Sequence, residues 1–363
     1  MHGKGSKDAM TPSIFLRVID GRLILWNYVR HEQFEIDLDH LRRLMQLSGG
    51  DKPTDEPADS ALSTAGCLDD IDPPAWGWDC LSRIFHVGTQ IALRQDEALP
   101  EEDAYRGYIE YCASIADKVP EFKIERPGKV IQLPQAELSK LGEMPLWKAL
   151  RDRQTCRAFE SKMLPLEEVA SALWATFGTI HGDCRHDLEA IGLMPVGYRR
   201  TSPSGGSLHP SEAYLVAMRI DGLPPGIYHY RSHKHELSVV RDNFETTTLG
   251  KLLCAQTFAN ALSYGIFVTS RFDKMWWKYP HSRAYRVALL DIGCLIQTFQ
   301  LVCNARHIQS WPTGYFIDHE VNKLLDVDPD IESAMFFLGA GIGGGAVARE
   351  ALETLRRFNA EVQ

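Results

Sequence analysis

This chain of 363 residues has few features that would indicate a membrane protein or a nucleic-acid binder. It lacks an uninterrupted apolar run of the roughly 20 residues that span a bilayer, and its first residues lack the apolar centre of a signal peptide. The formal net charge of −9 leaves no excess of basic residues for a general nucleic-acid surface. We therefore expect a cytoplasmic protein that binds neither membrane nor nucleic acid.

Patterns that would indicate metal sites or serine-hydrolase chemistry are missing as well. The eight cysteines contain no Cys-x-x-Cys pair, and the 13 histidines form no pair at metal-ligand spacing. A Gly-x-Ser-x-Gly elbow is also absent. We expect no metal, and the composition, 44% hydrophobic and 24% charged, is that of an ordinary globular protein.

The first 50 residues predict a small module built from a hairpin and a helix. Two strands flank Asp20 and Gly21, a dipeptide that favours hairpin turns. Asp37 or Asp39 can cap a helix whose leucines share one face and which ends at two glycines. Such a module is too small to bury much apolar surface by itself.

The rest of the chain divides into three segments. Residues 51–74 are rich in Asp, Pro, Ser, Ala and Thr, which predicts a flexible loop. Residues 75–135 predict a helical connector, and residues 136–363 predict the main domain. In that domain, antiparallel strands mix with helices, the longest over about 281–306 and apolar on most sides. The pattern predicts an α+β fold, with a mixed or antiparallel sheet flanked by helices.

An arginine-rich segment opens the main domain and could bind a phosphate. Phosphate recognition requires forked, permanently charged donors together with hydroxyl groups. Such groups occur at Arg151, Arg153, Thr155 and Arg157. Taken alone, this segment is better interpreted as the solvated basic end of a helix.

A glycine-rich loop follows about 50 residues later. It comprises Pro203, Ser204, Gly205, Gly206 and Ser207. Glycines allow the backbone to approach a flat ring closely and to direct N–H groups at it. A plain tight turn is the alternative interpretation.

Lys278 and Tyr279 stand side by side just before the long helix. A lysine acts as a general base when burial or nearby cations lower its pKa, and a neighbouring tyrosine can relay a proton. Lys274 and Arg283 are candidates for such cations. An exposed lysine beside a half-buried tyrosine is the alternative interpretation.

Two further segments follow the long helix. Gly314 or Tyr315 could offer a backbone N–H to a ligand, although a buried aromatic turn is an equally good interpretation. The glycine run that includes Gly341 suggests a dinucleotide-binding fingerprint, but that site requires a second strand and an acidic residue beyond Gln363. A strand exit that places Arg349 near a phosphate fits this segment better.

In this order and spacing, the five segments resemble the nitroreductase-like flavoproteins, and within them the SagB-type (McbC-like) dehydrogenases. The resemblance covers roughly residues 140–350 and implies FMN as the cofactor. It implies that the arginine segment, Gly341 and Arg349 surround the phosphate, that the glycine-rich loop lies along the flavin, and that Gly314 or Tyr315 faces flavin N5. Gln154 stands where the family has a second arginine, so one phosphate contact is in doubt.

The resemblance also implies an activity. SagB-type enzymes oxidise a thiazoline or oxazoline to an azole, with a Lys-Tyr pair implicated in proton abstraction, which assigns that role to Lys278 and Tyr279. The implied substrate is a peptide or carrier-bound intermediate of natural-product biosynthesis. The implied assembly is a homodimer, with a cyclising enzyme as a further partner and a winged-helix-like N-terminal module. The alternatives are an NAD(P)H-dependent reductase or other desaturase, and a flavin-less docking scaffold.

Overall fold

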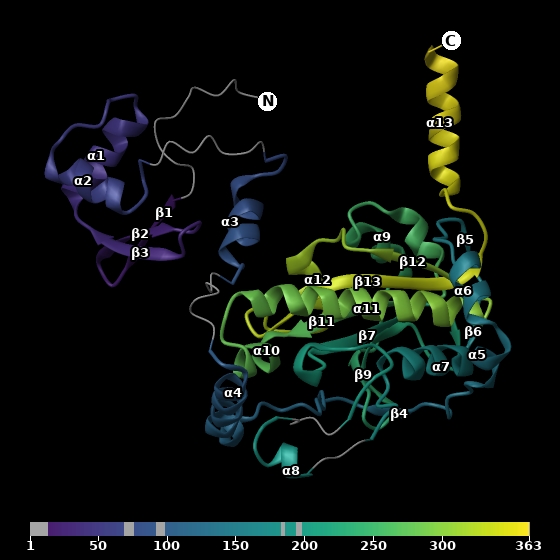
Figure 1. Ribbon diagram of the computed structural model, residues 1–363. Helices are drawn as coiled ribbons and strands as arrows, with labels where there is room; N and C mark the ends of the chain where they lie inside the picture. Colours follow the sequence, from purple (N-terminus) through teal and green to yellow (C-terminus); the bar gives the residue numbers. More distant parts are fainter. Residues whose placement is uncertain (1–13, 69–75, 92–98, 183–185, 194–197, 363) are drawn as a thin grey trace. The chain divides into compact units, whose positions relative to one another are not determined.

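The computed structural model describes residues 14–68, 76–91, 99–182, 186–193 and 198–362 (Figure 1). The chain divides into two compact units. Unit 1 comprises residues 1–100 and 281–283, and unit 2 comprises residues 101–280 and 284–363. The division differs from the expected segments, because the second half of the expected connector belongs to unit 2.

Unit 1 contains a three-stranded antiparallel sheet with the order β1-β2-β3, followed by helices. The described elements are β1 (Ile14–Ile19), β2 (Arg22–Asn27), β3 (Glu32–Ile36), α1 (Leu38–Ser48), α2 (Pro57–Thr64) and α3 (Cys80–Gly88). The hairpin turn is at Asp20 and Gly21, and the Asp37 carboxylate accepts the N–H groups of Asp39 and His40 at the start of α1. The predicted hairpin and capped helix are confirmed.

The flexible loop expected over residues 51–74 is wrong where α2 forms. Leu62 of α2 is buried in one apolar cluster with Leu25 and Leu44. Asp59, which is 1% exposed, pairs with Arg43 at 2.6 Å. Hydrogen bonds from Arg43 hold the pKa of Asp59 well below its usual range. The apolar residues Leu62, Ala65 and Cys67 and one ion pair therefore give this segment a fixed place, which its composition could not indicate.

Unit 2 is built on one antiparallel sheet with the strand order β12-β13-β11-β7-β9-β10-β4, to which β5 adds by pairing with β13. Its strands are β4 (Val130–Gln132), β5 (Phe159–Glu160), β6 (Leu164–Pro165), β7 (Ser211–Ala217), β8 (Ile220–Asp221), β9 (Gly226–Arg231), β10 (Glu236–Arg241), β11 (Tyr264–Arg271), β12 (Gln309–Thr313) and β13 (Glu332–Gly343). Its α-helices are α4 (Glu101–Ile115), α5 (Ser139–Glu143), α6 (Leu146–Asp152), α7 (Leu166–Phe177), α8 (His186–Glu189), α9 (Leu249–Leu252), α10 (Phe272–Lys278), α11 (Arg283–Ala305), α12 (Asp318–Leu325) and α13 (Arg349–Val362). The expected α+β fold is confirmed.

Helices cover both faces of this sheet because its central strands are apolar on both sides. Leu215 of β7 packs toward α7 and α11, whereas the next residue, Val216, packs toward α9 and α12. Successive side chains of a strand point to opposite faces, so a run of buried residues requires two covering layers. Figure 1 shows α11 lying along the strands.

The long helix α11 is confirmed within two residues of its expected ends. Among the described helices, it alone is long and apolar enough to cross a membrane by length and composition, which corrects the expectation that no segment passes that test. Its Ile292, Leu295 and Phe299 belong to the main apolar cluster, so its apolar character has a partner in the sheet. A core helix passes the same test.

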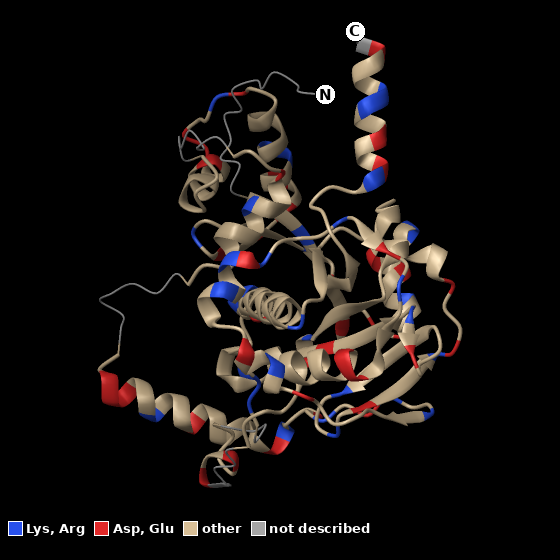
Figure 2. Cartoon of the chain, turned by 90° about the vertical axis from the view of Figure 1, so that its right-hand side faces the viewer, with Lys and Arg blue, Asp and Glu red and all other residues tan. Residues whose placement is uncertain are grey.

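Two elements differ from the sequence-based expectations. The last strand, expected over 333–338, continues to Gly343 because Gly339 pairs with β11 and β12, Gly341 with β12 and Gly343 with β5. The short helix α10 was not expected, and it carries Lys278 as its last residue. The C-terminal helix α13 carries side chains of both charge signs (Figure 2).

Buried charges attach α10 to the sheet. Lys274 of α10, which is fully buried, donates to Glu212 of β7 at 2.7 Å. His229 of β9 lies 3.2 Å from the other carboxylate oxygen of Glu212. Burial favours the neutral form of Glu212, but Lys274, His229 and Arg200 outweigh it and hold its pKa well below the usual range. This cluster fixes the helix that positions Lys278.

Candidate functional site

Lys278 and Tyr279 lie where α10 ends. The Tyr279 N–H caps the helix by donating to the Met275 carbonyl at 2.9 Å, and Pro280 prevents the helix from continuing. Lys278 is only 2% exposed. Its Nζ donates to the Leu193 carbonyl at 2.8 Å. The pair is therefore held in place rather than freely solvated.

Burial lowers the pKa of Lys278. Of the two causes expected, burial is the one that acts, whereas like charge from Lys274 and Arg283 is not among the causes; Lys274 is paired with Glu212. A lysine with a lowered pKa is more often in the neutral form that can accept a proton.

The glycine-rich loop meets Tyr279. Gly206 has φ +60°, and a Cβ at this position would collide with the Tyr279 hydroxyl. A Cβ on Gly205 would collide with Val287 of α11. Only glycines therefore allow the loop to lie between α11 and Tyr279, and the structure brings together two motifs about 70 residues apart in sequence.

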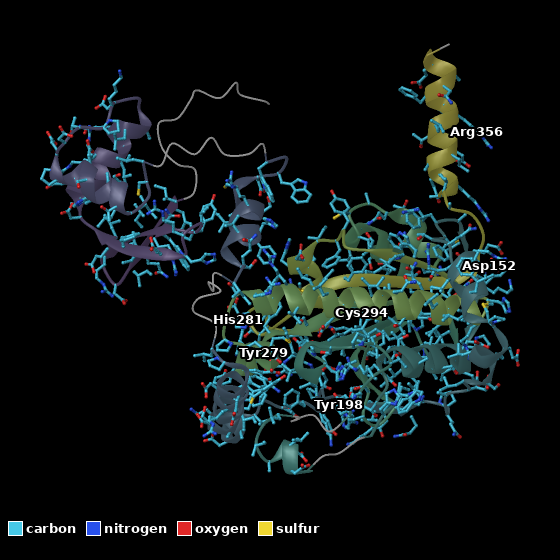
Figure 3. The ribbon with its side chains drawn as sticks, viewed as in Figure 1. Asp152, Tyr198, Tyr279, His281, Cys294 and Arg356 are labelled. Carbon is cyan, nitrogen blue, oxygen red and sulfur yellow. The ribbon has the colours of Figure 1, made fainter. Side chains whose placement is uncertain are left out.

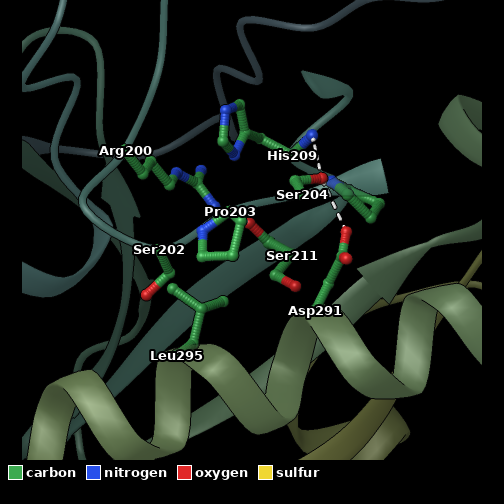
Figure 4. Close-up of a pocket in the computed structure, with 9 residues that line it drawn as sticks. Arg200, Ser202, Pro203, Ser204, His209, Ser211, Asp291 and Leu295 are labelled. Atoms are coloured by element: carbon green, nitrogen blue, oxygen red, sulfur yellow. Dashed lines mark hydrogen bonds between the residues drawn. The ribbon is translucent and has the colours of Figure 1, made fainter. Parts of the chain in front are cut away.

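Asp291 of α11 holds the other side of the loop (Figure 4). Its carboxylate accepts the Ser204 hydroxyl at 2.6 Å and the Gly205 N–H at 3.1 Å. The Ser204 oxygen in turn accepts the His209 N–H at 2.9 Å. Asp291 is 7% exposed, and burial raises its pKa although both bonds oppose that effect. The sequence reasoning missed this residue; its signal was that it is the one acidic residue in the 23-residue helix α11.

A small polar cavity lies behind the loop, with room for about one water molecule. Among its lining atoms, Arg200 Nε, His209 Nε2 and Ser211 Oγ have no hydrogen-bond partner within the described residues. Burial, then Arg200 and Lys274, lower the pKa of His209 to about 3. His209 is therefore neutral at physiological pH, and its Nε2 can donate or accept a hydrogen bond, depending on the tautomer.

The arginine-rich segment lies between β12 and the end of β13. Thr155 forms an isolated parallel β-bridge with Ser310, and the Arg157 N–H donates to the Gly345 carbonyl at 2.9 Å. The Arg157 guanidinium is exposed and donates to the Ala346 carbonyl at 3.1 Å. This segment therefore meets the chain that leaves the glycine run of β13, as the expected shared phosphate pocket requires.

A cavity of about 420 Å³ opens beside Arg157. It is lined by Arg157, Ala255, Gln256, Thr257, Phe258, Ala346, Val347, Ala348, Glu350 and Ala351.

The other two arginines of the segment lie at the end of α6. Arg153 is partly buried there, whereas Arg151 pairs with Asp152 at 2.7 Å. Arg151 is thus paired with its neighbour at the surface.

Of the two candidates for a backbone donor, Gly314 is the better one. The Tyr315 N–H already donates to the Thr313 hydroxyl at 3.1 Å. The Tyr315 carbonyl accepts Gln256 Nε2 at 3.0 Å, which ties this turn to the loop that lines the larger cavity. The Tyr315 ring is 67% exposed, so it is not the buried aromatic of the alternative interpretation; Trp311 and Phe316 are buried instead.

Gly341 and Arg349, both expected near the phosphate, belong to different elements, β13 and α13. Gly341 is buried inside β13, where a Cβ would press on the Ser263 backbone, so this glycine serves close strand packing. Arg349 is exposed at the first residue of α13. The exposed part of the glycine run is Gly344 and Gly345, next to Arg157.

The predicted residues form two groups at different levels of α11. The glycine-rich loop contacts α11 at Val287 and Asp291 and also contacts Tyr279. Helix α6, which leads into the arginine segment, contacts α11 near its other end, where Asn304 Nδ2 donates to the Ala149 carbonyl at 2.9 Å. From Val287 to Asn304 the helix rises roughly 26 Å. Figure 3 shows Tyr279 and Asp152 near opposite ends of α11.

Comparison with known proteins gives a family for most of unit 2. The sequence model of the nitroreductase family matches residues 150–342. The trifolitoxin-processing protein TfxB of Rhizobium leguminosarum bv. trifolii is 30% identical over 143 residues, which are 38% of this chain and 38% of that protein. A protein of Methanocaldococcus jannaschii with a provisional nitroreductase name is 24% identical over 54% of this chain and 89% of its own length.

The fold also occurs among solved structures. The crystal structure of a provisionally named nitroreductase of Anabaena variabilis superposes with a TM-score of 0.51 and 20% identity, covering 76% of this chain and 49% of that chain. This similarity concerns the fold alone. The present chain spans about two fifths of the length of the trifolitoxin-processing protein.

Proposed function

Since the chain belongs to the nitroreductase family, we propose that it is an FMN-dependent dehydrogenase that oxidises an azoline ring, a thiazoline or oxazoline, to an azole in a peptide substrate. The observation that supports the proposal most is the close packing of the Tyr279 hydroxyl against Gly206 of the glycine-rich loop. A buried lysine with a lowered pKa therefore stands next to a loop suited to a flat ring. A reductase that only passes hydride has no need of such a base.

The residues present fit FMN. Gly205 and Gly206 let the loop pack closely against Val287 and Tyr279, and Arg153, Thr155 and Arg157 supply charged and hydroxyl donors for a phosphate. When bound, FMN would accept the hydride that leaves the azoline ring. The backbone N–H of Gly314 is the donor we assign to the flavin ring, and Gln154 leaves the phosphate with one charged donor fewer than in the resembled enzymes.

Lys278 supplies the proton chemistry. Aromatisation of an azoline removes one proton and one hydride from the ring, so a base must take the proton. Neutral Lys278 Nζ is that base, and the Leu193 carbonyl fixes the direction of its N–H bond. Tyr279, between the lysine and the glycine-rich loop, orients the ring to be oxidised and can relay the ring proton to Lys278.

A second copy of the chain completes the site in this proposal. The residues of α11 that the two groups contact, Val287 and Asn304, are roughly 26 Å apart along the helix, so we infer that one copy does not bring both groups to the same flavin. One copy would supply the glycine-rich loop with Lys278, and the other the arginine segment. On α11, Leu290 is 68% and Leu289 41% exposed, which leaves an apolar strip for a homodimer interface.

A peptide is the substrate class that we propose. The support is the partial similarity to a protein named for processing trifolitoxin. A cyclising enzyme that forms the azoline is the corresponding partner, and the cytoplasm is the location in which we place the reaction. The alternative functions are an NAD(P)H-dependent reductase and a flavin-less docking scaffold, and the experiment below distinguishes them from this proposal.

The test begins with the visible spectrum of the purified protein and the mass of its released chromophore. We expect the two-band spectrum of oxidised flavin with the mass of FMN. A short synthetic peptide with one thiazoline should then lose two hydrogens without NAD(P)H. Steady consumption of NAD(P)H with quinones and no reaction with the thiazoline would support the reductase, and failure to bind FMN after reconstitution would support the scaffold.

We predict that Asp291→Ala weakens FMN binding at least tenfold, because the loop loses two hydrogen bonds to a charged acceptor, each worth about 1.5–3 kcal/mol. Asp291→Asn keeps an acceptor for Gly205 and should lose less than half of that binding free energy. Titration of the apoprotein with FMN, followed by flavin fluorescence, measures both. Equal affinity of wild type and Asp291→Ala would remove Asp291 from the cofactor site.

A further inference from the structure

Helix α4 precedes the region that the family model matches, yet it packs on the helix that carries the Lys-Tyr pair. Trp277 Nε1 donates to the Ile115 carbonyl at 3.1 Å, and the Tyr111 hydroxyl donates to the Trp277 carbonyl at 3.5 Å. Cys112 of α4 is fully buried. The C-terminal half of α4 is therefore fixed against α10, although its acidic first turn is exposed (Figure 2).

Tyr108 lies one helical turn before Cys112, on the face of α4 that meets the pair. Its hydroxyl is hydrogen-bonded to Tyr279. Lys278 Nζ lies 5.8 Å from the centre of the Tyr108 ring, within the range of a cation–π contact. Tyr108 thus touches both members of the pair, through different parts of its side chain.

The environment of Tyr108 suits a fixed hydroxyl group. Burial, together with Tyr279, raises the pKa of Tyr108, so the group stays protonated over the physiological range. The side chain is 37% exposed, whereas Lys278 is 2% exposed, so the ring separates the lysine from solvent on this side. A protonated hydroxyl can donate to Tyr279 while the ring covers the amine.

We propose that Tyr108 is a positioning residue of the dehydrogenase: its hydroxyl holds Tyr279 against the glycine-rich loop, and its ring shields Lys278 from water. The inference rests on the proposed function and extends it, because it makes a helix outside residues 150–342 part of the active site. Without the hydroxyl, Tyr279 keeps its place in the chain but loses one restraint on its orientation.

The expected effects follow from this division of roles. Tyr108→Phe keeps the ring and removes the hydroxyl, so kcat should fall about tenfold while KM and FMN content stay within twofold of wild type. Tyr108→Leu removes the ring as well and should lower kcat by about a further tenfold. Tyr105→Phe, at a tyrosine of the same helix that is 62% exposed, should match wild type and is the control.

The experiment compares Tyr108→Phe, Tyr279→Phe and the double variant, each as full chain loaded with FMN, with a short peptide carrying one thiazoline as the probe. If the two hydroxyls act as one unit, the double variant is no slower than the slower single variant. A purely structural role for Tyr108 would instead lower FMN content or change kcat by factors that multiply. Either of these two results, or a kcat of Tyr108→Phe equal to that of wild type, overturns the inference about Tyr108 and leaves the proposed function standing. If the wild-type protein does not oxidise the thiazoline peptide, both the inference and the proposed function are overturned.

Discussion

Lys278→Ala is expected to abolish azoline oxidation while the protein still binds FMN with an unchanged visible spectrum. The variant removes the base that takes the ring proton, and general-base catalysis contributes about 10²–10⁴-fold to a rate. The lost contacts, a hydrogen bond to Leu193 and the cation–π contact with Tyr108, do not involve the glycine-rich loop, so cofactor binding should persist. Single-turnover reduction of the bound flavin by the thiazoline peptide measures the effect.

The matched control is Lys123→Ala, because Lys123 is an exposed lysine in the same unit. It should oxidise the peptide at the wild-type rate. Turnover by Lys278→Ala within threefold of wild type would refute the assignment of the base and turn attention to Tyr279.

The wild-type rate should also depend on pH in a defined direction. Only neutral Lys278 accepts a proton, so kcat rises as the pH rises through its pKa. Burial lowers that pKa from the ordinary value of 10.5, so the ascending limb should lie at a lower pH than for a free lysine. A profile of kcat against pH measures the limb, and a midpoint at the ordinary value would contradict a buried base.

Lys274→Met is expected to destabilise unit 2 by about 3–5 kcal/mol, the largest effect on stability that we predict. The substitution removes the cation that donates to Glu212 at 2.7 Å and leaves a buried carboxylate with His229 and Arg200 nearby. Urea denaturation measures the free energy of unfolding. Because the cluster attaches α10 to β7, thiazoline oxidation should fall with stability.

A paired variant separates the lost charge from the lost packing. Lys274→Met combined with Glu212→Gln removes both charges and should recover at least half of the lost free energy. Lys251→Met, at an exposed lysine of α9, should change stability by less than about 0.5 kcal/mol. If the paired variant is no more stable than Lys274→Met alone, the stabilisation comes from packing and not from the ion pair.

The same cluster gives stability a dependence on pH. The pKa of Glu212 is lower in the folded protein than in the unfolded chain, so the unfolded chain binds more protons at acidic pH. The stabilisation is therefore complete above the ordinary glutamate pKa of 4.5 and is lost as the pH falls toward the folded-state value. Lys274→Met should flatten this acid limb, since it removes the main cation that lowers the pKa.

The sequence by itself determined the features that depend on neighbouring residues and on spacing. Turn chemistry located the hairpin at Asp20 and Gly21, and helical periodicity located α11 within two residues of its ends. The order of five short motifs indicated the nitroreductase family before any contact was known. Such features are readable because each is encoded within a single element or a single loop.

Only the tertiary structure decided which distant residues meet. Tyr108 carries no local signal of a site, and Asp291 stands out only as a lone acidic residue in α11; both gain a role because α4 and α11 bring them to the Lys-Tyr pair and to the glycine-rich loop. Burial by the folded chain lowers the pKa of Lys278, and the pairing of Lys274 with Glu212 depends on a contact between α10 and β7. Likewise, α2 and the glycine end of β13 are ordered by packing and strand pairing, which composition alone does not describe. Hydrogen bonds, burial and charge compensation across long stretches of chain are set by the fold as a whole, and no window of sequence contains them.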